Sequence, residues 1–310
     1  MTKAIRDVYG EALVKYGGAN ERVVVMDADV SSSTKSGLFA AQYPERFFNC
    51  GIAESAMMGM AAGFASMGKI PFVNAFAVFA GTIGAVAART YMSYSQLNIK
   101  LMGAYAGLSA GYDGSTHHAL EDIAFMRALP NMTVLVASDA AITDWMVDMA
   151  IRTDGPMYVR LSREAAPGCH GEHPSFALGK GCIVREGTDA TVIACGIMVS
   201  EALKAADILK ERGIGVKVVD MFCIKPIDRE LIGQCAAKTG LIVTAEEHST
   251  IGGLGSAVAE VLATGGSRAR LEMVGMPDRH AESGPYGGLL HKYGMDAGAI
   301  VAAVMRGLER

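Results

Sequence analysis

The sequence lacks several patterns that mark other classes of protein. Its six cysteines include no C-x-x-C pair, which gives no support to a zinc ribbon or a disulfide framework. Basic residues are not in excess, because 28 Lys and Arg stand against 32 Asp and Glu for a net charge of -4. A basic face for nucleic acid is therefore not indicated. We expect reduced thiols and no nucleic-acid partner.

The sequence also lacks a segment suited to a membrane. No apolar signal core opens the chain, because Asp7 interrupts the N-terminal segment. The most apolar stretch, residues 71–88, contains a proline, an asparagine and two glycines, and its apolar residues are mostly small. That composition favours a strand followed by a buried helix over a spanning helix. We therefore predict a cytoplasmic protein with no membrane contact.

Half of the residues are hydrophobic, and they form short apolar runs that alternate with helical patterns. The predicted strands are 22–29, 70–74, 99–103, 133–137, 157–161, 190–194, 215–220, 241–245 and 271–275. The predicted helices are 53–67, 81–95, 120–129, 140–152, 200–212, 229–238, 255–263 and 297–308. The alternation of strands and helices along the chain predicts parallel sheets that are covered by helices on both faces.

The alternation is interrupted near residue 170 by a segment with two prolines, two glycines and two histidines, which is typical of a linker. The predicted fold class is therefore α/β, with two domains that each contain a mainly parallel sheet and flanking helices. We expect the domains at residues 1–165 and 179–310, joined by a linker at 166–178.

Glu54 opens a predicted helix in which every neighbour is small or apolar. A carboxylate in the first turn of a helix is stabilised by the helix dipole by about 0.3–1 kcal/mol, and this is its ordinary explanation. Burial would instead raise its pKa and allow it to hold or share a proton at neutral pH. The residues alone leave both interpretations open.

Further candidates follow predicted strands, where α/β sheets bind ligands. Phe76 and Phe79 are either core residues or a stacking wall for a planar heterocycle. Asp113 and His117 lie on a loop before a helix, where an acid and an imidazole can move protons. A metal site is less favoured there, because the adjacent His118 would point in a different direction.

Two arginines, Arg6 and Arg163, are either solvated or able to hold an anionic tail by paired hydrogen bonds. A G-x-x-x-x-G-K-[ST] phosphate loop is absent. The glycines after Thr250 lack the full G-x-G-x-x-G spacing, so a dinucleotide site is not supported.

Six segments, taken in order, resemble the transketolase family of thiamine-diphosphate enzymes. The resemblance extends over nearly the whole chain. The part of those enzymes that the chain resembles is their carboxyl-terminal half, which contains a pyrimidine-binding domain and a transketolase C-terminal domain. The segments are MDADV (26–30), GIAESAMMGMAAG (51–63), NAFAVF (74–79), DGSTHHALEDIAFMRALPNM (113–132), GPMYVRLSR (155–163) and EEHSTIGGLGSAVAE (246–260).

One family motif is missing from the chain. Members hold the diphosphate through a metal bound by a G-D-G motif and a later Asn, and no G-D-G occurs here. The resemblance therefore implies the C-terminal subunit of a split transketolase, whose N-terminal partner subunit carries G-D-G and holds Mg2+ and most of the diphosphate. It also implies self-association through the pyrimidine domain and a heterotetramer. No metal site is expected in this chain.

The resemblance implies transfer of a two-carbon ketol unit from a phosphorylated or otherwise anionic ketose to an aldose. Glu54 and His117 would be the catalytic residues, with Glu54 sharing a proton with the cofactor's aminopyrimidine. The expected contacts of thiamine diphosphate are Asp29, Glu54, Phe76 and Phe79. The expected substrate contacts are Arg6, Ser33, Asp113, His117 and Arg163.

The sequence departs from the family pattern at two places. Tyr105 stands where a histidine that helps to bind substrate phosphate is common, and His280 with Ala281 stands where Phe-Gly is usual. The first departure puts ordinary pentose-phosphate specificity in doubt. Two alternatives remain, the beta subunit of a 2-oxo-acid dehydrogenase and a non-catalytic subunit that stabilises a partner.

Overall fold

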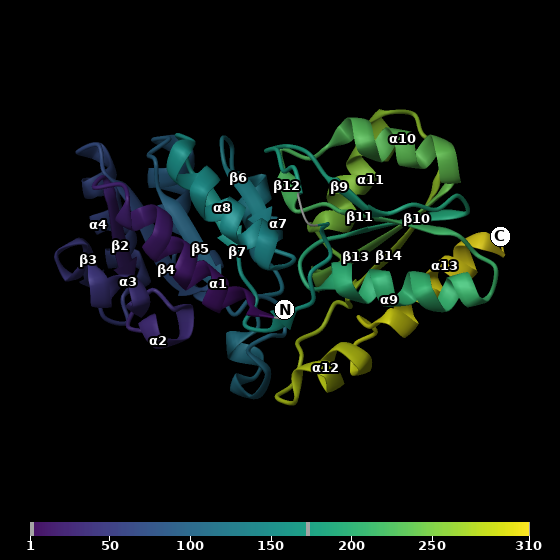
Figure 1. Cartoon of the computed structure of the whole chain (residues 1–310), viewed down its shortest axis with the longest axis horizontal. Helices are drawn as coiled ribbons and strands as arrows, with labels where there is room; N and C mark the ends of the chain where they lie inside the picture. The colour runs from purple at the N-terminus through teal and green to yellow at the C-terminus, as the bar shows by residue number, and fades with distance from the viewer. Residues whose placement is uncertain (1–2, 172–173, 310) are drawn as a thin grey trace.

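A computed structural model describes residues 3–171 and 174–309 and contains two α/β units side by side (Figure 1). The purple-to-teal first half of the chain forms one unit, and the green-to-yellow second half forms the other. Each unit is built on one sheet of mainly parallel strands. The predicted fold class is therefore confirmed.

The first unit contains a seven-stranded sheet with the order β12-β6-β7-β5-β4-β2-β3. Six of its strands are parallel: β2 (Val23–Asp27), β3 (Phe47–Asn49), β4 (Ile70–Phe76), β5 (Lys100–Ala104), β6 (Thr133–Val136) and β7 (Met157–Arg160). The seventh, β12 (Cys223–Lys225), comes from the second half of the chain and pairs antiparallel with β6. The two halves therefore share a sheet.

Helices cover both faces of this sheet. One face packs on α1 (Ile5–Ala12) and α8 (Ala140–Arg152), and the other packs on α4 (Glu54–Ser66) and α7 (Asp122–Ala128). Short elements complete the unit: α2 (Ser31–Thr34), α3 (Gly37–Gln42), π-helical turns at Leu13–Gly17 and Ala88–Tyr94, and the pair β1 (Lys3–Ala4) and β8 (Ala165–Ala166). The single helix predicted at 81–95 is instead divided into α5 (Ala77–Gly81), α6 (Ala85–Ala87) and the second π-helical turn.

The second unit contains a five-stranded sheet with the order β14-β13-β10-β11-β9. Its strands are β9 (Cys182–Arg185), β10 (Ala190–Ala194), β11 (Val216–Asp220), β13 (Leu241–Ser249) and β14 (Arg270–Met276), and only β9 runs antiparallel. The helices α9 (Met198–Glu211) and α13 (Ala297–Leu308) cover one face. The other face carries α10 (Arg229–Thr239) and α11 (Leu254–Thr264), while α12 (Tyr286–Lys292) packs near the first unit.

The apolar core continues from one unit into the other. A single cluster of buried side chains includes Met57 of α4 and Met126 of α7 together with Ile232 of α10 and Val258 of α11. Across the described residues, no helix combines the length and apolar character that crossing a membrane requires.

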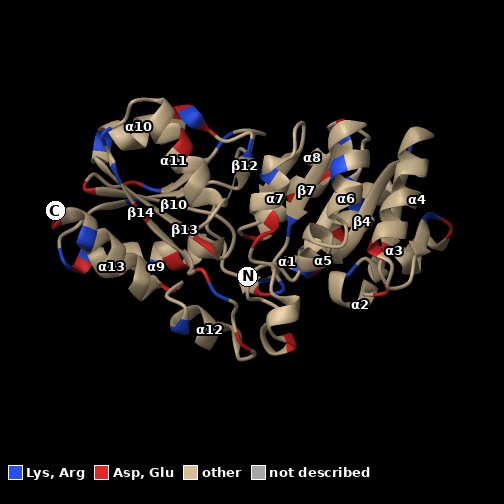
Figure 2. Ribbon diagram, turned by 180° about the vertical axis from the view of Figure 1, so that it is seen from behind, with Lys and Arg blue, Asp and Glu red and all other residues tan. Residues whose placement is uncertain are grey.

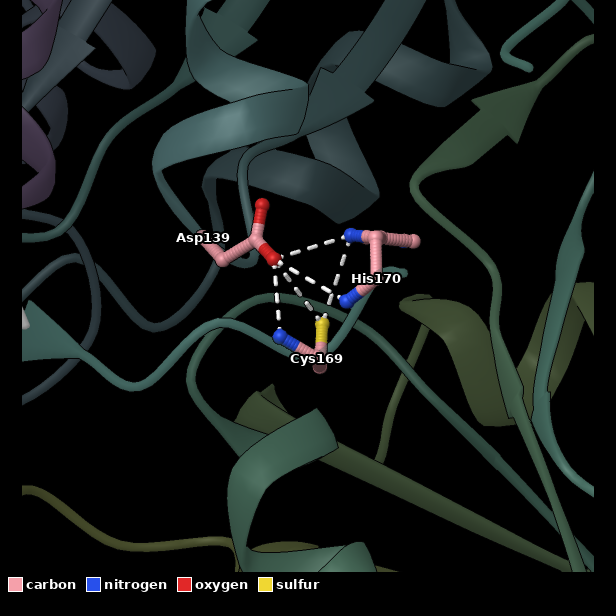
Figure 3. Close-up of side chains that lie close together, drawn as sticks. All are labelled: Asp139, Cys169 and His170. Carbon is pink, nitrogen blue, oxygen red and sulfur yellow. Dashed lines mark hydrogen bonds and ion pairs between the residues drawn. The ribbon is translucent and has the colours of Figure 1, made fainter. Parts of the chain in front are cut away.

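An ionic clamp of Asp139, His170 and Asp220 joins the two units at the linker. Figure 3 shows Asp139 and His170 of this clamp beside Cys169. His170 lies between two carboxylates, with Nδ1 2.9 Å from Asp139 and Nε2 3.2 Å from Asp220. Asp139 caps α8 by accepting from the amide of Ile142, and it also accepts from the amide of Cys169. The first unit, the linker and β11 therefore meet at one imidazole.

The charges of the clamp depend on one another. Burial alone lowers the pKa of His170, yet the hydrogen bond with Asp139 and the nearby carboxylate of Asp220 outweigh this and raise it well above 6.5. Burial raises the pKa of Asp139, but hydrogen bonds from His170 and from backbone amides bring it below 3.8. Burial also raises the pKa of Asp220, one of whose oxygens has no hydrogen-bond partner among the described residues.

The same group has the spacing of a metal site, because ligand atoms of Asp139, Cys169 and His170 all lie within 4.8 Å of one another. A proton on His170 places one positive charge next to both carboxylates without a metal ion. Burial also raises the pKa of the Cys169 thiol to about 11, so that it stays neutral. Metals bind thiolates and neutral imidazoles, and we therefore interpret the cluster as an ionic clamp.

Replacing the central imidazole tests this interpretation. We expect His170→Asn to lower the free energy of unfolding by about 3 kcal/mol, because it leaves two buried carboxylates without a cation. Folded His170 keeps its proton above pH 6.5, where the unfolded chain releases it, so its contribution is complete below pH 6.5 and decreases as pH rises. The contribution of Asp139 is present above pH 3.8 and is lost as pH falls below it.

The effect of His170→Asn in urea unfolding is therefore expected to be largest between pH 3.8 and 6.5. His291→Asn is the matched control, because His291 makes a 2.7 Å contact with Asp296 but its side chain is 84% exposed. The control should change stability by less than about 1 kcal/mol. Equal effects of the two variants would exclude the clamp.

Candidate active site

Most of the predicted site residues gather at one edge of the seven-stranded sheet. Strands β2, β4, β5 and β7 are parallel, so the segments that follow them leave the sheet on the same side. These segments carry Asp29 and Ser33 after β2, Phe76 and Phe79 at the end of β4 and in α5, Asp113 and His117 after β5, and Arg163 after β7.

Four rings form an aromatic wall at this edge. The ring of Phe76 has its centroid 4.6 Å from that of Tyr105, 5.9 Å from His117 and 6.2 Å from Phe79. His117 is also 5.4 Å from Phe79, edge to face. Phe76, Phe79 and His117 are only partly buried. The wall therefore offers apolar surface on which a planar group can pack.

Two arginines lie beside the same wall, close to the ring of Tyr105. The guanidinium carbons of Arg6 and Arg163 are 5.5 and 5.2 Å from the Tyr105 ring centroid. Arg6 donates to the Tyr105 hydroxyl at 2.6 Å and to the carbonyl of Ser33 at 3.5 Å. Within the described ranges, no carboxylate forms an ion pair with either arginine. The pair is therefore suited to an anionic ligand.

Tyr105 adopts a backbone conformation that is unusual for its residue type. Its φ is +57°, in the left-handed region, which costs a residue with a Cβ roughly 1–2 kcal/mol. Such strain persists where the surroundings hold the residue in place, and it is concentrated at functional sites. Here the contacts with Arg6, Arg163 and Phe76 hold the ring.

Glu54 is the first residue of α4 and is only 5% exposed. Among the described residues, no hydrogen bond to its carboxylate is found, although buried polar groups are usually paired. Its carboxylate oxygens do not belong to the enclosed polar atoms that lack a partner in the described structure, so they stay accessible to a ligand.

Asp29 lies at the same edge and accepts a 2.8 Å hydrogen bond from Asn49 at the end of β3. Its neighbour Asp27 is buried and accepts from the hydroxyls of Thr34 and Ser36 at 2.7 and 2.8 Å. Asp27 therefore shapes the turn that carries Ser33, a role that the sequence did not indicate.

The loop after β5 places Asp113 and His117 in two consecutive 3-10 turns. Asp113 is exposed, and in the described structure no contact links it to the aromatic wall or to the arginines. His118 is buried, with neither ring nitrogen hydrogen-bonded among the described residues, and burial lowers its pKa. The printed contacts therefore join six predicted residues around Tyr105, namely Arg6, Ser33, Phe76, Phe79, His117 and Arg163. Asp29 and Glu54 lie at the same sheet edge, and Asp113 stands apart.

The same loop reads G-L-S-A-G at residues 107–111, a spacing shared with the nucleophile elbow of hydrolases. Ser109 is buried, and its hydroxyl donates to the carbonyl of Ala106 at 2.6 Å. A nucleophilic serine needs an exposed hydroxyl next to a base. The arrangement does not meet that requirement.

Comparisons with known proteins identify the family of both units. Residues 1–168 match the family "Transketolase, pyrimidine binding domain", and residues 179–300 match "Transketolase, C-terminal domain". A solved structure described as "Split gene transketolase, inactive beta4 tetramer" is 48% identical over 99% of this chain and 98% of its own, with a TM-score of 0.92.

Two curated relatives show the relation to split and to full-length members. The 6-deoxy-6-sulfo-D-fructose transketolase subunit of Clostridium sp. is 40% identical over 99% of this chain and 95% of its own length. The transketolase of Rattus norvegicus is 39% identical over 97% of this chain but only 48% of its own length. The chain therefore belongs to the transketolase family and corresponds to the C-terminal part of its split members.

Proposed function

We propose that this chain is the C-terminal subunit of a split, thiamine-diphosphate-dependent transketolase that moves a two-carbon ketol unit from an anionic ketose to an aldose. The observation that carries the proposal is the joint placement of a buried carboxylate, an aromatic wall and two arginines without ion-pair partners at one sheet edge. We also propose that residues 1–165 and 179–310 are its two domains.

The residues at this edge fit one end of the cofactor and not the other. A buried carboxylate without a partner and partly exposed aromatic rings suit an aminopyrimidine, which stacks on apolar surface and shares a proton with an acid. No G-D-G metal motif is present in the sequence. We therefore assign the diphosphate and Mg2+ to a partner subunit.

Within this assignment, thiamine diphosphate supplies the carbon acid that takes up the two-carbon unit when it is bound. Glu54, at the start of α4, would share a proton with the pyrimidine ring. Phe76 and Phe79 orient the ring by packing against it. His117 lies against both phenyl rings, where its imidazole can exchange a proton with a substrate oxygen.

The arginines favour a substrate with a negatively charged end. Two guanidiniums that flank one tyrosine can donate several hydrogen bonds to a phosphate or sulfonate. The relative from Clostridium sp. is named for a sulfonated sugar, which is consistent with an anionic tail. Tyr105 stands in place of the usual histidine, and its hydroxyl accepts a hydrogen bond from Arg6.

The surface around the start of α4 and α6 is suited to covering by another chain. Ile52, Ile83 and Val86 are 83%, 51% and 78% exposed, and α4 carries no charged residue after Glu54 (Figure 2). Apolar side chains gathered in this way are typical of subunit contacts. We propose that this surface mediates self-association in a heterotetramer with the partner subunit.

Removing the acid of Glu54 is expected to abolish turnover with little effect on folding. Glu54→Gln, assembled with the partner subunit, should lower kcat by several orders of magnitude, because the amide cannot hold the shared proton. Ketol transfer from a ketose to an aldehyde measures this. Glu45→Gln, at an exposed position of the same unit, should leave the rate unchanged; wild-type turnover by Glu54→Gln would exclude the proton role.

The need for a partner is tested with the purified chain. With thiamine diphosphate and Mg2+ it should show no ketol transfer on its own, because the diphosphate-binding half is missing. Activity should appear on addition of a chain that carries G-D-G. Turnover by the homogeneous lone chain would contradict the split-subunit assignment.

The anionic substrate end is tested at Arg163. In the assembled enzyme, Arg163→Gln should raise KM for a phosphorylated ketose by roughly 10- to 100-fold, which corresponds to loss of a charged hydrogen bond. The same variant should change KM for an uncharged ketose by less than about threefold. Arg212→Gln, at an exposed position in the second unit, is the control, and equal changes with both ketoses would rule out tail recognition.

A further inference from the structure

The loop at residues 106–119 forms a closed neck where it leaves and rejoins the body of the protein. Gly107 and Ala119 exchange two backbone hydrogen bonds of 3.1 Å. Asp113 and His117 lie on the loop between these two residues. The position of His117 in the aromatic wall therefore depends on how the neck is held.

The second unit holds one side of this neck. Glu247, buried at the end of β13, accepts a 2.6 Å hydrogen bond from the amide of Leu108. Its other carboxylate oxygen accepts from the hydroxyl of Tyr286 at 3.0 Å. A carboxylate held at both oxygens presents a fixed acceptor to the loop.

Arg160 holds the other side of the neck and connects it to the same strand. Its guanidinium donates to the carbonyl of Ala119 at 2.8 Å and to the carbonyl of Glu247 at 2.9 Å. A third bond, of 2.7 Å, goes to Asp122 at the start of α7. Both ends of the neck are therefore fixed to β13 through buried, charge-assisted hydrogen bonds.

The loop approaches Glu247 so closely that only glycine fits at position 107. A Cβ on Gly107 would lie 2.4 Å from the carboxyl carbon of Glu247, and the φ of Gly107 is +63°. Farther along the loop, Ser283 donates to the carbonyl of Tyr112 at 2.7 Å. The second unit therefore supports the loop at its neck and along its side.

We propose that Glu247 is a positioning residue of the C-terminal unit, which fixes the 106–119 loop so that His117 is held against Phe76 and Phe79. This inference rests on the proposed ketol transfer for its catalytic consequence. Its structural part, the ordering of the loop by Glu247, can be measured without activity.

The neighbouring residue Glu246 provides a matched control. It is also a fully buried acid of β13, and burial raises the pKa of both carboxyls to about 7. Glu246 accepts from the amides of Leu254 and Gly255 at 2.7 and 2.8 Å, so it caps α11 and does not touch the loop. Replacing either residue removes a buried carboxylate, but only the replacement of Glu247 removes a hydrogen bond to the loop.

The first test is amide hydrogen exchange of the full chain at pH 8, where both acids are ionised. Glu247→Ala should increase exchange at the Leu108 amide at least tenfold, while Glu246→Ala should increase it at 254–255 and leave Leu108 unchanged. Glu247→Gln retains an acceptor oxygen and should keep Leu108 protected. Unchanged protection of Leu108 in Glu247→Ala, or equal loss in Glu246→Ala, would overturn the proposal.

The second test is kinetic and uses the enzyme assembled with its partner subunit. Glu247→Ala should lower kcat/KM for the ketose by roughly 10- to 100-fold, because small displacements of reacting groups reduce rates to this extent. Glu246→Ala and Glu247→Gln should stay within about threefold of the unaltered enzyme. Absence of ketol transfer in the unaltered enzyme would refute the proposed function and leave the exchange result standing.

A milder variant keeps the proposal testable if Glu247→Ala does not fold. Tyr286→Phe removes only the hydroxyl that supports the second oxygen of Glu247. It should increase exchange at Leu108 by about two- to fivefold with no change at 254–255. No change at Leu108 would show that Glu247 does not order the loop.

Discussion

The buried guanidinium of Arg160 is the contact on which both halves of the molecule depend. It ends β7, pairs with Asp122 of α7 and binds the carbonyls of Ala119 and Glu247. The hydroxyl of Tyr158 donates to the same Asp122 carboxylate at 2.6 Å. A buried charge is tolerated only when it is paired and hydrogen-bonded, so these partners must keep their places together. The sheet edge that carries the candidate site and the end of the second sheet therefore share one polar network.

The sequence predicts an element well where apolar residues recur at a regular spacing within the element itself. The strand at 190–194 and the helix at 297–308 were predicted to the residue, the latter because Asp296 caps a regular apolar pattern. The three residues of β12 gave no signal, since their pairing partner β6 lies far away in the chain. The helix expected at 81–95 is broken near Gly84, where a Cβ would lie 2.8 Å from the carbonyl oxygen of Ala80.

Most residues of the candidate site are predicted from the family resemblance, and only some from the residues around them in the sequence. Arg6, Tyr105 and Arg163 come from three separate elements, so no spacing along the chain could have indicated that two guanidiniums flank one ring. The apolar neighbours of Glu54 left two interpretations open, and the folded chain shows a buried side chain. The contact of Glu247 with Leu108 joins residues 139 positions apart, and only the folded chain reveals it. The roles of these residues remain predictions.

The strand exchange at β12 has a consequence for how this chain can be divided. Without residues 223–225, the edge of β6 would present unpaired backbone groups, and exposed edges of this kind recruit other strands. A fragment that stops at the linker would therefore be prone to aggregate, however complete its own helices and strands. The two halves have separate sheets, but the first sheet is completed by a strand of the second half. The behaviour of a chain cut at the linker would therefore reflect the exposed edge of β6 more than the properties of either half.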